Sequence, residues 1–280
     1  MTGNESVPGI DPCQAAPGRM YDYLLGGKDN FAADRELAER LVAVAPHSRW
    51  IVRQNRAFVE RAVRYCAERG LRQFLDLGCG LPTTDPVHEI ARRVDPTCRV
   101  VYVDNDPVIA RHAQALLAAS TTGVAAIRRD VRRPKEILCH DDVRALIDVT
   151  RPVAVLLAAV LHNVTDDDDP AAIVAHAMAD LAPGSHLVLS HPTHDVLPGQ
   201  AARAKELYRC TGAPLVTRSR HEVGALFAGL ELVAPGLVFT AEWRAEREID
   251  RPGLSGMYAA VARKPDTPGP ARQPDRRAAG

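Results

Sequence analysis

Phe74-Leu75-Asp76-Leu77-Gly78-Cys79-Gly80 decides the fold of this chain, because a short apolar run passes directly into an acidic residue and two glycines spaced one apart. Glycine at these two positions allows backbone angles that a side chain obstructs, and it lets a ligand approach the main chain closely. The stretch therefore predicts a buried strand that leads into a ligand-binding turn.

A second apolar run supports this interpretation. Val100-Val101-Tyr102-Val103 ends at Asp104. In a strand–helix–strand unit of a parallel sheet, this carboxylate lies at the tip of the neighbouring strand, where it can accept hydrogen bonds from both hydroxyls of a ribose. The two segments together predict a protein that binds an adenosine-containing cofactor.

The residues after the second glycine distinguish two kinds of such cofactor. Dinucleotide-binding turns use a third glycine and a helix N-terminus that receives a pyrophosphate, whereas the third position here is Thr83. Asp85 is expected to be the N-cap of a helix that Pro86 opens, and its carboxylate would repel phosphates. A cofactor with a ribose and no phosphate fits better, and a nicotinamide-dependent oxidoreductase is the weaker rival.

Three parts of the chain resemble a known family. The D-x-G-x-G pattern from Asp76 to Gly80 resembles the first motif of class I S-adenosylmethionine (SAM) methyltransferases. Asp104 and Asp130 are similar to the acids that follow the second and third strands of that family. The string YDYLLGGKDNF, residues 21–31, resembles the signature of one bacterial family of these enzymes with an unassigned acceptor. The resemblance covers roughly residues 17–264.

This resemblance implies a fold and a cofactor. The fold is α/β, a Rossmann-like seven-stranded, mostly parallel sheet with helices on both faces, and SAM is converted to S-adenosyl-L-homocysteine (SAH). The glycines are expected to face the methionine end of SAM, with Asp76 placing its ammonium, Asp104 binding the ribose and Asp130 accepting from the adenine amino group. Further cofactor contacts are expected from Tyr21, Gly78, Cys79, Gly80, Asn105, Val131 and Ala158.

Alternation of apolar runs and helical patterns predicts right-handed crossovers between parallel strands. Expected strands are 99–104, 125–130, 153–158 and 186–190, and expected helices are 107–119, 135–148, 170–181 and 220–228. Two last strands, 230–233 and 257–262, are expected to form a hairpin with one antiparallel member.

With 280 residues, 46% of them apolar, the chain is expected to form one domain. That domain spans 17–264, and its part 17–70 is a helical and lid-like extension. The tails 1–16 and 265–280 are expected to be disordered. The polar, glycine-containing string 21–31 makes a poor helix and a poor strand, so it predicts an irregular lid over a ligand; the alternative is an ordered surface loop.

Composition argues against several classes of partner. The formal net charge is zero and the pI about 7.1, which gives no overall electrostatic attraction to nucleic acid or anionic membranes. Six cysteines without C-x-x-C spacing argue against zinc and disulfides and predict reduced thiols in the cytoplasm. There is no basic-apolar leader, and the longest apolar run, 153–161, is shorter than the ~20 residues that span a bilayer.

His162 is the candidate catalytic residue. It follows the expected strand 153–158 at the sheet edge where ligands bind in open α/β folds. It could be a structural imidazole that lines the site, or a general base if the acceptor must lose a proton. His191 and His194 are weaker candidates, and Asn55 and Arg56 could reach the same place.

The acidic run 166–169 could attract a cation. Asp169, however, precedes Pro170 at an expected helix start, where negative charge is favoured. No metal is therefore expected.

The expected reaction is in-line methyl transfer from the SAM sulfonium to a nucleophile. The chain after strand 153–158 lacks the Asn/Asp-Pro-Pro-aromatic motif that is associated with methylation of adenine, cytosine or glutamine amino groups. A small-molecule acceptor is the expectation, and a non-catalytic SAM-binding regulator is the alternative. The identity of the acceptor and the oligomeric state are left open.

Overall fold

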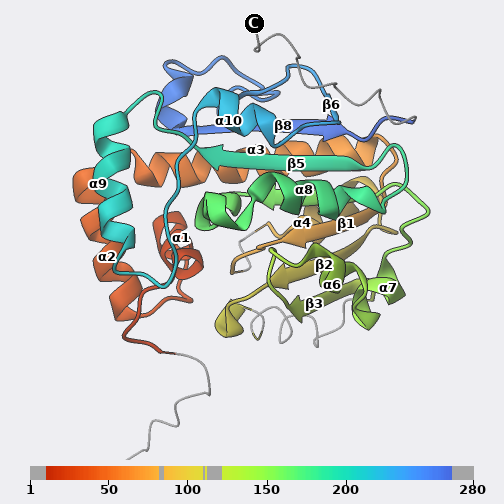
Figure 1. Ribbon diagram of the computed structural model, residues 1–280, viewed down its shortest axis with the longest axis horizontal. Coiled ribbons are helices and arrows are strands. Elements are labelled where there is room, and N and C mark those ends of the chain that lie inside the picture. Colours follow the sequence, from red (N-terminus) through yellow and green to blue (C-terminus); the bar gives the residue numbers. More distant parts are fainter. Residues whose placement is uncertain (1–10, 82–84, 110, 112–121, 267–280) are drawn as a thin grey trace, which may run out of the picture.

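A computed structural model describes residues 11–81, 85–109, 111 and 122–266 of the chain (Figure 1). Its centre is an eight-stranded sheet of order β3-β2-β1-β4-β5-β8-β6, with β7 paired to β8 off this path. The first five strands of that order are parallel, and β8 runs antiparallel to β5. The strands are β1 (Gln73–Leu77), β2 (Arg99–Asp104), β3 (Val124–Arg128), β4 (Ala154–Ala158), β5 (His186–Pro192), β6 (Glu231–Leu232), β7 (Val238–Phe239) and β8 (Met257–Arg263).

The sheet has one strand more than the seven expected, because two short strands share one side of β8. β6 pairs with β8 at Leu232 and Ala262, and β7 pairs further along at Phe239 and Tyr258. Gly236, with a φ of +89°, lies in the connection between them. The expected antiparallel pairing of 230–233 with 257–262 is present, and β7 is the unexpected addition.

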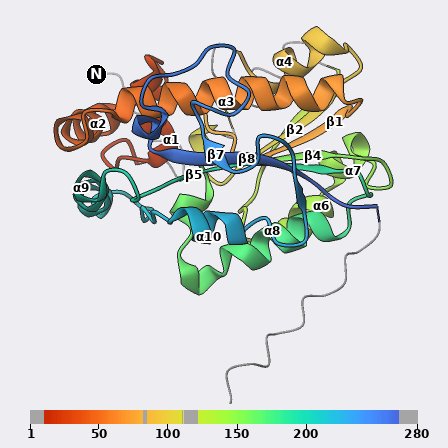
Figure 2. The same cartoon turned by 90° about the horizontal axis from the view of Figure 1, so that it is seen from above.

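Helices cover both faces of the sheet (Figure 2). α3 and α4 pack on one face around Phe58, Phe74 and Trp243, and α6, α7, α8 and α10 lie on the other. The helices are α1 (Pro17–Leu25), α2 (Ala32–Val44), α3 (Ser48–Glu68), α4 (Val87–Val94), α6 (Pro134–Leu138), α7 (Asp141–Leu146), α8 (Pro170–Ala179), α9 (Pro198–Tyr208) and α10 (Arg220–Ala225). No helix among the described residues is both long and apolar enough to cross a bilayer.

Two expected helices differ in the structure. The expected helix 135–148 is divided into α6 and α7, because His140 interrupts it and caps α7 by accepting from the backbone N–H of Asp142. The expected helix 107–119 begins at Pro107, and beyond Ile109 only residue 111 is described. Asp106 opens this helix, accepting from the N–H of Val108 at 2.8 Å.

α1, α2 and α9 stand together beyond the carboxyl ends of the parallel strands (Figure 1). They share an apolar cluster that includes Met20, Leu24, Leu37 and Ala204. Of the tails, 1–10 and 267–280 lie outside the described residues, whereas the buried Ala15 joins this cluster. The cluster forms a helical cap, and it closes one end of the sheet.

The N-terminal string 21–31 is more regular than the irregular lid that the sequence predicts. Residues 21–25 belong to α1, which ends at Gly26 with a φ of +92°. The polar residues that argued against a helix form the turn after it: Asp22 accepts from the N–H of Asp29 at 3.1 Å and from Asn30 Nδ2 at 2.8 Å. A Cβ at Gly27 would lie 1.9 Å from Asp22 Oδ1, so this string is largely a structural motif.

Candidate cofactor and acceptor site

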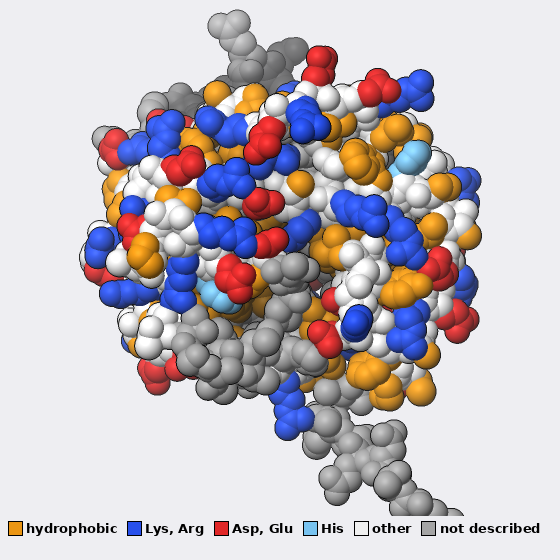
Figure 3. All heavy atoms as spheres, turned by 180° about the vertical axis from the view of Figure 1, so that it is seen from behind, with side chains coloured by type: hydrophobic (Ala, Val, Ile, Leu, Met, Phe, Trp, Pro, Cys, Tyr) orange, Lys and Arg blue, Asp and Glu red, His pale blue; other side chains and the backbone are white. Residues whose placement is uncertain are grey.

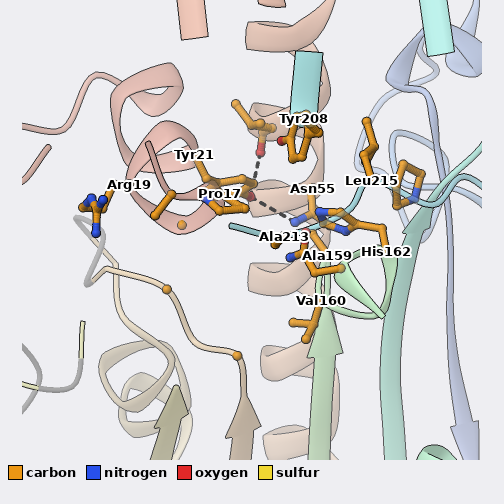
Figure 4. Close-up of a pocket in the computed structure, with 18 of the residues that line it drawn as sticks. Pro17, Arg19, Tyr21, Asn55, Ala159, Val160, His162, Tyr208, Ala213 and Leu215 are labelled. Carbon is orange, nitrogen blue, oxygen red and sulfur yellow. Dashed lines mark hydrogen bonds between the residues drawn. The ribbon is translucent and has the colours of Figure 1, made fainter. Parts of the chain in front are cut away.

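A cavity of about 660 Å³ lies between the sheet and the helical cap (Figure 4). This volume falls within the ~300–1,000 Å³ that is typical of small-molecule sites. The residues expected to bind the cofactor and the candidate catalytic residue His162 line it: Tyr21, Asp76, Gly78, Cys79, Gly80, Asp104, Asn105, Asp130, Val131, Ala158 and His162. The weaker candidates His191 and His194 are not among its described lining residues. Asn55 and Arg56 of α3 line it too.

Glycine occupies the two positions after β1 for different structural reasons. Gly78 has a φ of +74°, and a Cβ there would lie 2.6 Å from a methyl of Val160. Gly80 has a φ of +65°, and a Cβ there would meet no atom of the described residues within 4 Å. Gly78 therefore allows close packing against the turn after β4, whereas Gly80 borders open space in the cavity.

Asp76 is a buried carboxyl group and Asp104 is a half-buried one, and both lie at the ends of adjacent strands. Burial raises the pKa of Asp76 to about 7, with Arg56 opposing and Asp104 reinforcing the shift. Burial also raises the pKa of Asp104 to about 6, although the carboxylate accepts from the N–H groups of Gly80 at 3.0 Å and Asp106 at 2.9 Å. Asp104 thus organises both turns while it faces the cavity.

Asp130 lies beyond β3, which ends at Arg128 rather than at 130. Burial would raise the pKa of this carboxyl, but hydrogen bonds from Arg132, one of them 2.6 Å long, prevail and lower it. An ionised acceptor therefore lies at this end of the cavity.

The expected N-cap of the helix after β1 is wrong. α4 starts one residue later, at Val87, and its N-cap Pro86 offers no side-chain acceptor. Asp85 instead pairs with Arg93 in the last turn of α4, and its backbone carbonyl accepts from Arg56. Thr83 lies outside the described residues.

Tyr21 belongs to a hydrogen-bonded chain that joins the helical cap to the sheet. Its hydroxyl donates to the Val52 carbonyl at 3.2 Å and accepts from Asn55 Nδ2 at 2.9 Å (Figure 4). Asn55 Oδ1 accepts from Ser190 Oγ at 2.5 Å, and Ser190 Oγ accepts from the N–H of Ala159 at 3.0 Å. Ala159 has a φ of +56°, which is unusual for a residue other than glycine and occurs often at functional turns.

His162 lies in the short 3₁₀ helix η1 (Leu161–Asn163) after β4. Burial lowers its pKa to about 3, and His191 and Arg218 add to this effect. Its Nδ1 atom is buried and has no hydrogen-bond partner in the described part of the chain. The ring is therefore a neutral imidazole at physiological pH, and it borders the cavity.

Arg218 is a residue that the sequence analysis missed. Its side chain is buried and donates to the carbonyls of Leu161 at 3.0 Å and Val164 at 3.1 Å, on either side of His162. It also donates to His191 Nε2 at 2.7 Å and to Asp166 Oδ1 at 2.6 Å. Arg218 lies in an irregular segment between α9 and α10, where no local pattern marks it.

The acidic run 166–169 has structural partners. Asp169 caps α8 by accepting from the N–H of Ala172 at 2.9 Å, as expected. Asp166 pairs with Arg218 and Asp168 with Arg132. No group of three or more metal-ligating side chains occurs among the residues that the structure describes.

Comparison with known proteins shows the family. A family model described as S-adenosyl methyltransferase matches residues 4–265. A DUF574 family protein from Streptomyces avermitilis MA-4680 is 40% identical, with a TM-score of 0.86 and coverage of 90% of this chain and 98% of that one. A putative methyltransferase from Thermobifida fusca YX is 40% identical, with a TM-score of 0.87 and coverage of 94% and 100%. No curated protein matches. The chain belongs to the S-adenosyl methyltransferase family.

Proposed function

We propose that the protein transfers a methyl group from SAM to a small-molecule acceptor. The observation that carries this proposal is the continuity of one cavity, which joins the carboxylates at the ends of β1 and β2 and after β3 to a chamber beneath α9. A protein that only binds SAM as a regulator would need only the part of the cavity beside these carboxylates. The chamber gives an acceptor a place beside the cofactor.

The residues present fit SAM by their chemistry. Asp104 offers carboxylate oxygens to a ribose, Asp76 offers a buried anion to an ammonium, and Gly80 leaves the space beside the turn open. When bound, SAM supplies the methyl group on a sulfonium and so provides its own electrophile. The proposed roles of Asp130 at the adenine and Tyr21 at the cap follow the same geometry.

Positioning is the main contribution of the chain to the reaction. Holding two reactants in the correct geometry can lower a barrier by up to ~7–11 kcal/mol. The hydrogen-bonded chain from Tyr21 through Asn55 and Ser190 fixes the turn at Ala159, and α1, α2 and α9 of the helical cap line one side of the cavity. The products of the reaction are SAH and the methylated acceptor.

A small molecule suits this surface better than a nucleic acid. Figure 3 shows Lys and Arg side chains interspersed with Asp and Glu over the α3 face, and ion pairs such as Arg64 with Glu60 at 2.6 Å neutralise many of them. All six cysteines are free thiols, which fits a reducing compartment, and we place the reaction in the cytoplasm.

Calorimetric titration with SAH and with NAD tests the cofactor. We expect SAH to bind and NAD not to bind. Asp104→Ala should weaken SAH binding by about 1.5–3 kcal/mol, the range for hydrogen bonds to a charged group. Asp180→Ala, an exposed carboxylate at the end of α8, is the control and should leave the affinity unchanged. NAD binding with no SAH binding would support the oxidoreductase instead.

Methyl-labelled SAM tests the transfer. The protein is incubated with labelled SAM and a fractionated small-molecule extract, and label should pass into a small-molecule fraction. SAH binding without any transfer to small molecules or proteins would favour the regulator.

A further inference from the structure

α2, α9, the segment after α9 and the start of α3 contribute no charged side chain to the described lining of the cavity, and we take their side of it as the acceptor end. The charged residues of the lining lie on the N-terminal segment and α1, at Arg56 of α3, or on β1 and the turns after β2 and β3. α2, α9, the segment after α9 and the start of α3 supply neutral residues instead. Representative members are Leu41, Val52, Ala201, Ala204, Tyr208 and Leu215.

Two buried polar atoms at one edge of this chamber have no hydrogen-bond partner among the residues that the structure describes. They are His162 Nδ1 and Asn163 Oδ1, both in η1, and both residues line the cavity. His162 Nε2 makes no hydrogen bond to the described residues, and the ring lies between Ala159 and Leu215 (Figure 4). The hydrogen bond from the N–H of Val216 to the His162 carbonyl, 2.7 Å long, holds η1 against the chamber wall.

We propose that the acceptor is a neutral, largely apolar small molecule that presents a hydroxyl group to His162, an inference that rests on the proposed function. An unpaired ammonium or carboxylate would lose its hydration in this chamber without gaining a counter-charge. An ammonium can only donate hydrogen bonds and a carboxylate can only accept them. A hydroxyl does both, so it pairs with either tautomer of a neutral imidazole.

The proposed step is an in-line substitution at the methyl carbon of SAM. A lone pair of the hydroxyl oxygen forms the new carbon–oxygen bond, while the carbon–sulfur bond breaks and leaves its electrons on sulfur. The hydroxyl proton passes to Nε2 of His162, in the tautomer that carries its proton on Nδ1, and then to water.

Three probes with one ring system test the charge preference. SAH-loaded protein is titrated calorimetrically at pH 7.5 with 2-naphthol, 2-naphthoate and 2-naphthylmethylammonium. We expect 2-naphthol to bind at least about tenfold more tightly than either ion, a difference of ~1.4 kcal/mol. Equal or tighter binding of an ion overturns the proposal, and so does binding of none of the three while SAH is bound. Failure of SAH itself to bind refutes the proposed function instead.

Adjacent alanines on α9 test where the probe binds. Ala201 lines the cavity, whereas Ala202 is exposed on the outer side of the helix. Ala201→Phe should weaken 2-naphthol binding about tenfold more than it weakens SAH binding, and Ala202→Phe should change neither. An equal effect of the two substitutions would place the probe elsewhere and overturn the assignment.

Substitution of His162 tests the hydrogen bond. His162→Phe should weaken 2-naphthol binding more than His162→Gln, because glutamine can still donate and accept. The two variants should bind naphthalene, which has no hydroxyl, with equal affinity. If both variants bind 2-naphthol alike, His162 does not receive the hydroxyl.

Discussion

Asp76 shows how one carboxyl group can couple cofactor binding to pH. Its raised pKa, about 7, means that the free folded protein holds a proton that the unfolded chain releases near pH 4. This group therefore stabilises the fold fully below about pH 4, and its contribution is lost as the pH rises through 7. A bound ammonium favours the ionised carboxylate and so lowers the pKa of Asp76 in the complex.

SAH affinity should consequently rise with pH. Below the pKa of Asp76, binding requires release of a proton, and affinity should fall by up to about tenfold per pH unit. Calorimetric titrations between pH 5.5 and 8.5 measure this slope. Asp76→Asn should flatten it, with Asp104 leaving a smaller dependence near pH 6. An unchanged slope in that variant would mean that Asp76 does not meet the cofactor cation.

Substitution of the two glycines after β1 should affect stability and SAH binding differently. Gly78→Ala places a Cβ against Val160, so it should lower the melting temperature, and Val160→Ala should partly restore it. A Cβ at Gly80 meets no neighbour in the described part of the chain, so beyond the ~1–2 kcal/mol cost of a left-handed residue the main effect of Gly80→Ala should be weaker SAH binding. Differential scanning fluorimetry with and without SAH separates these effects. Equal loss of stability without rescue would refute the packing explanation for Gly78.

At the scale of elements, Arg218 should determine whether the turn after β4 is ordered. Arg218→Met removes the donors that hold the Leu161 and Val164 carbonyls, and we expect a loss of more than about 2 kcal/mol in unfolding free energy. Chemical denaturation measures it, with Arg209→Met at an exposed position as the control. A loss no larger than that of the control would show that the turn is held by other contacts.

The sequence predicts those elements best whose cause is local. β1 and β2 are recognisable because apolar runs end at glycines or an acid, and the capping box of Ser219 and Glu222 marks α10. α1 was missed as a helix because its polar residues have partners that a helical pattern does not show: Asp22 bonds within the turn after the helix, and Tyr21 bonds to Asn55 of α3. Arg218 was missed because its partners are distant in the sequence: the Leu161 and Val164 carbonyls lie more than fifty positions away, and His191 lies 27 positions away.

The candidate site was predictable because a parallel sheet gathers its strand ends. Residues from β1, β2, β3 and β4 meet at one edge, so the expected positions fell on one cavity. The sequence also marks the segment 198–212, helical around 201–208, as extra to a minimal sheet and a candidate cover for the acceptor side. The lining of the chamber was not predictable, because it depends on how α9 and the segment after it pack against α1 and α2. Its neutral lining is formed by segments that come together only in the folded protein.

At the scale of the whole molecule, Arg19 connects the helical cap to the cofactor edge. Its buried guanidinium bonds to Asp34 of α2 at 2.9 Å and to Asp106 at 2.9 Å, two residues after the proposed ribose ligand Asp104. Cofactor contacts that fix the turn after β2 should therefore also stabilise α1. At a SAH concentration of about 100 Kd, linkage adds ~2.7 kcal/mol to the folded state.

Hydrogen exchange should show whether this connection transmits cofactor binding. With SAH bound, amides of the turn after β2 and of residues 21–31 should both gain protection, because the cap then opens less often from its place over the cavity. In Arg19→Met, the turn after β2 should still gain protection while 21–31 gains much less. Equal exchange of 21–31 in free and SAH-bound wild-type protein would mean that the cap is a static cover, independent of the cofactor.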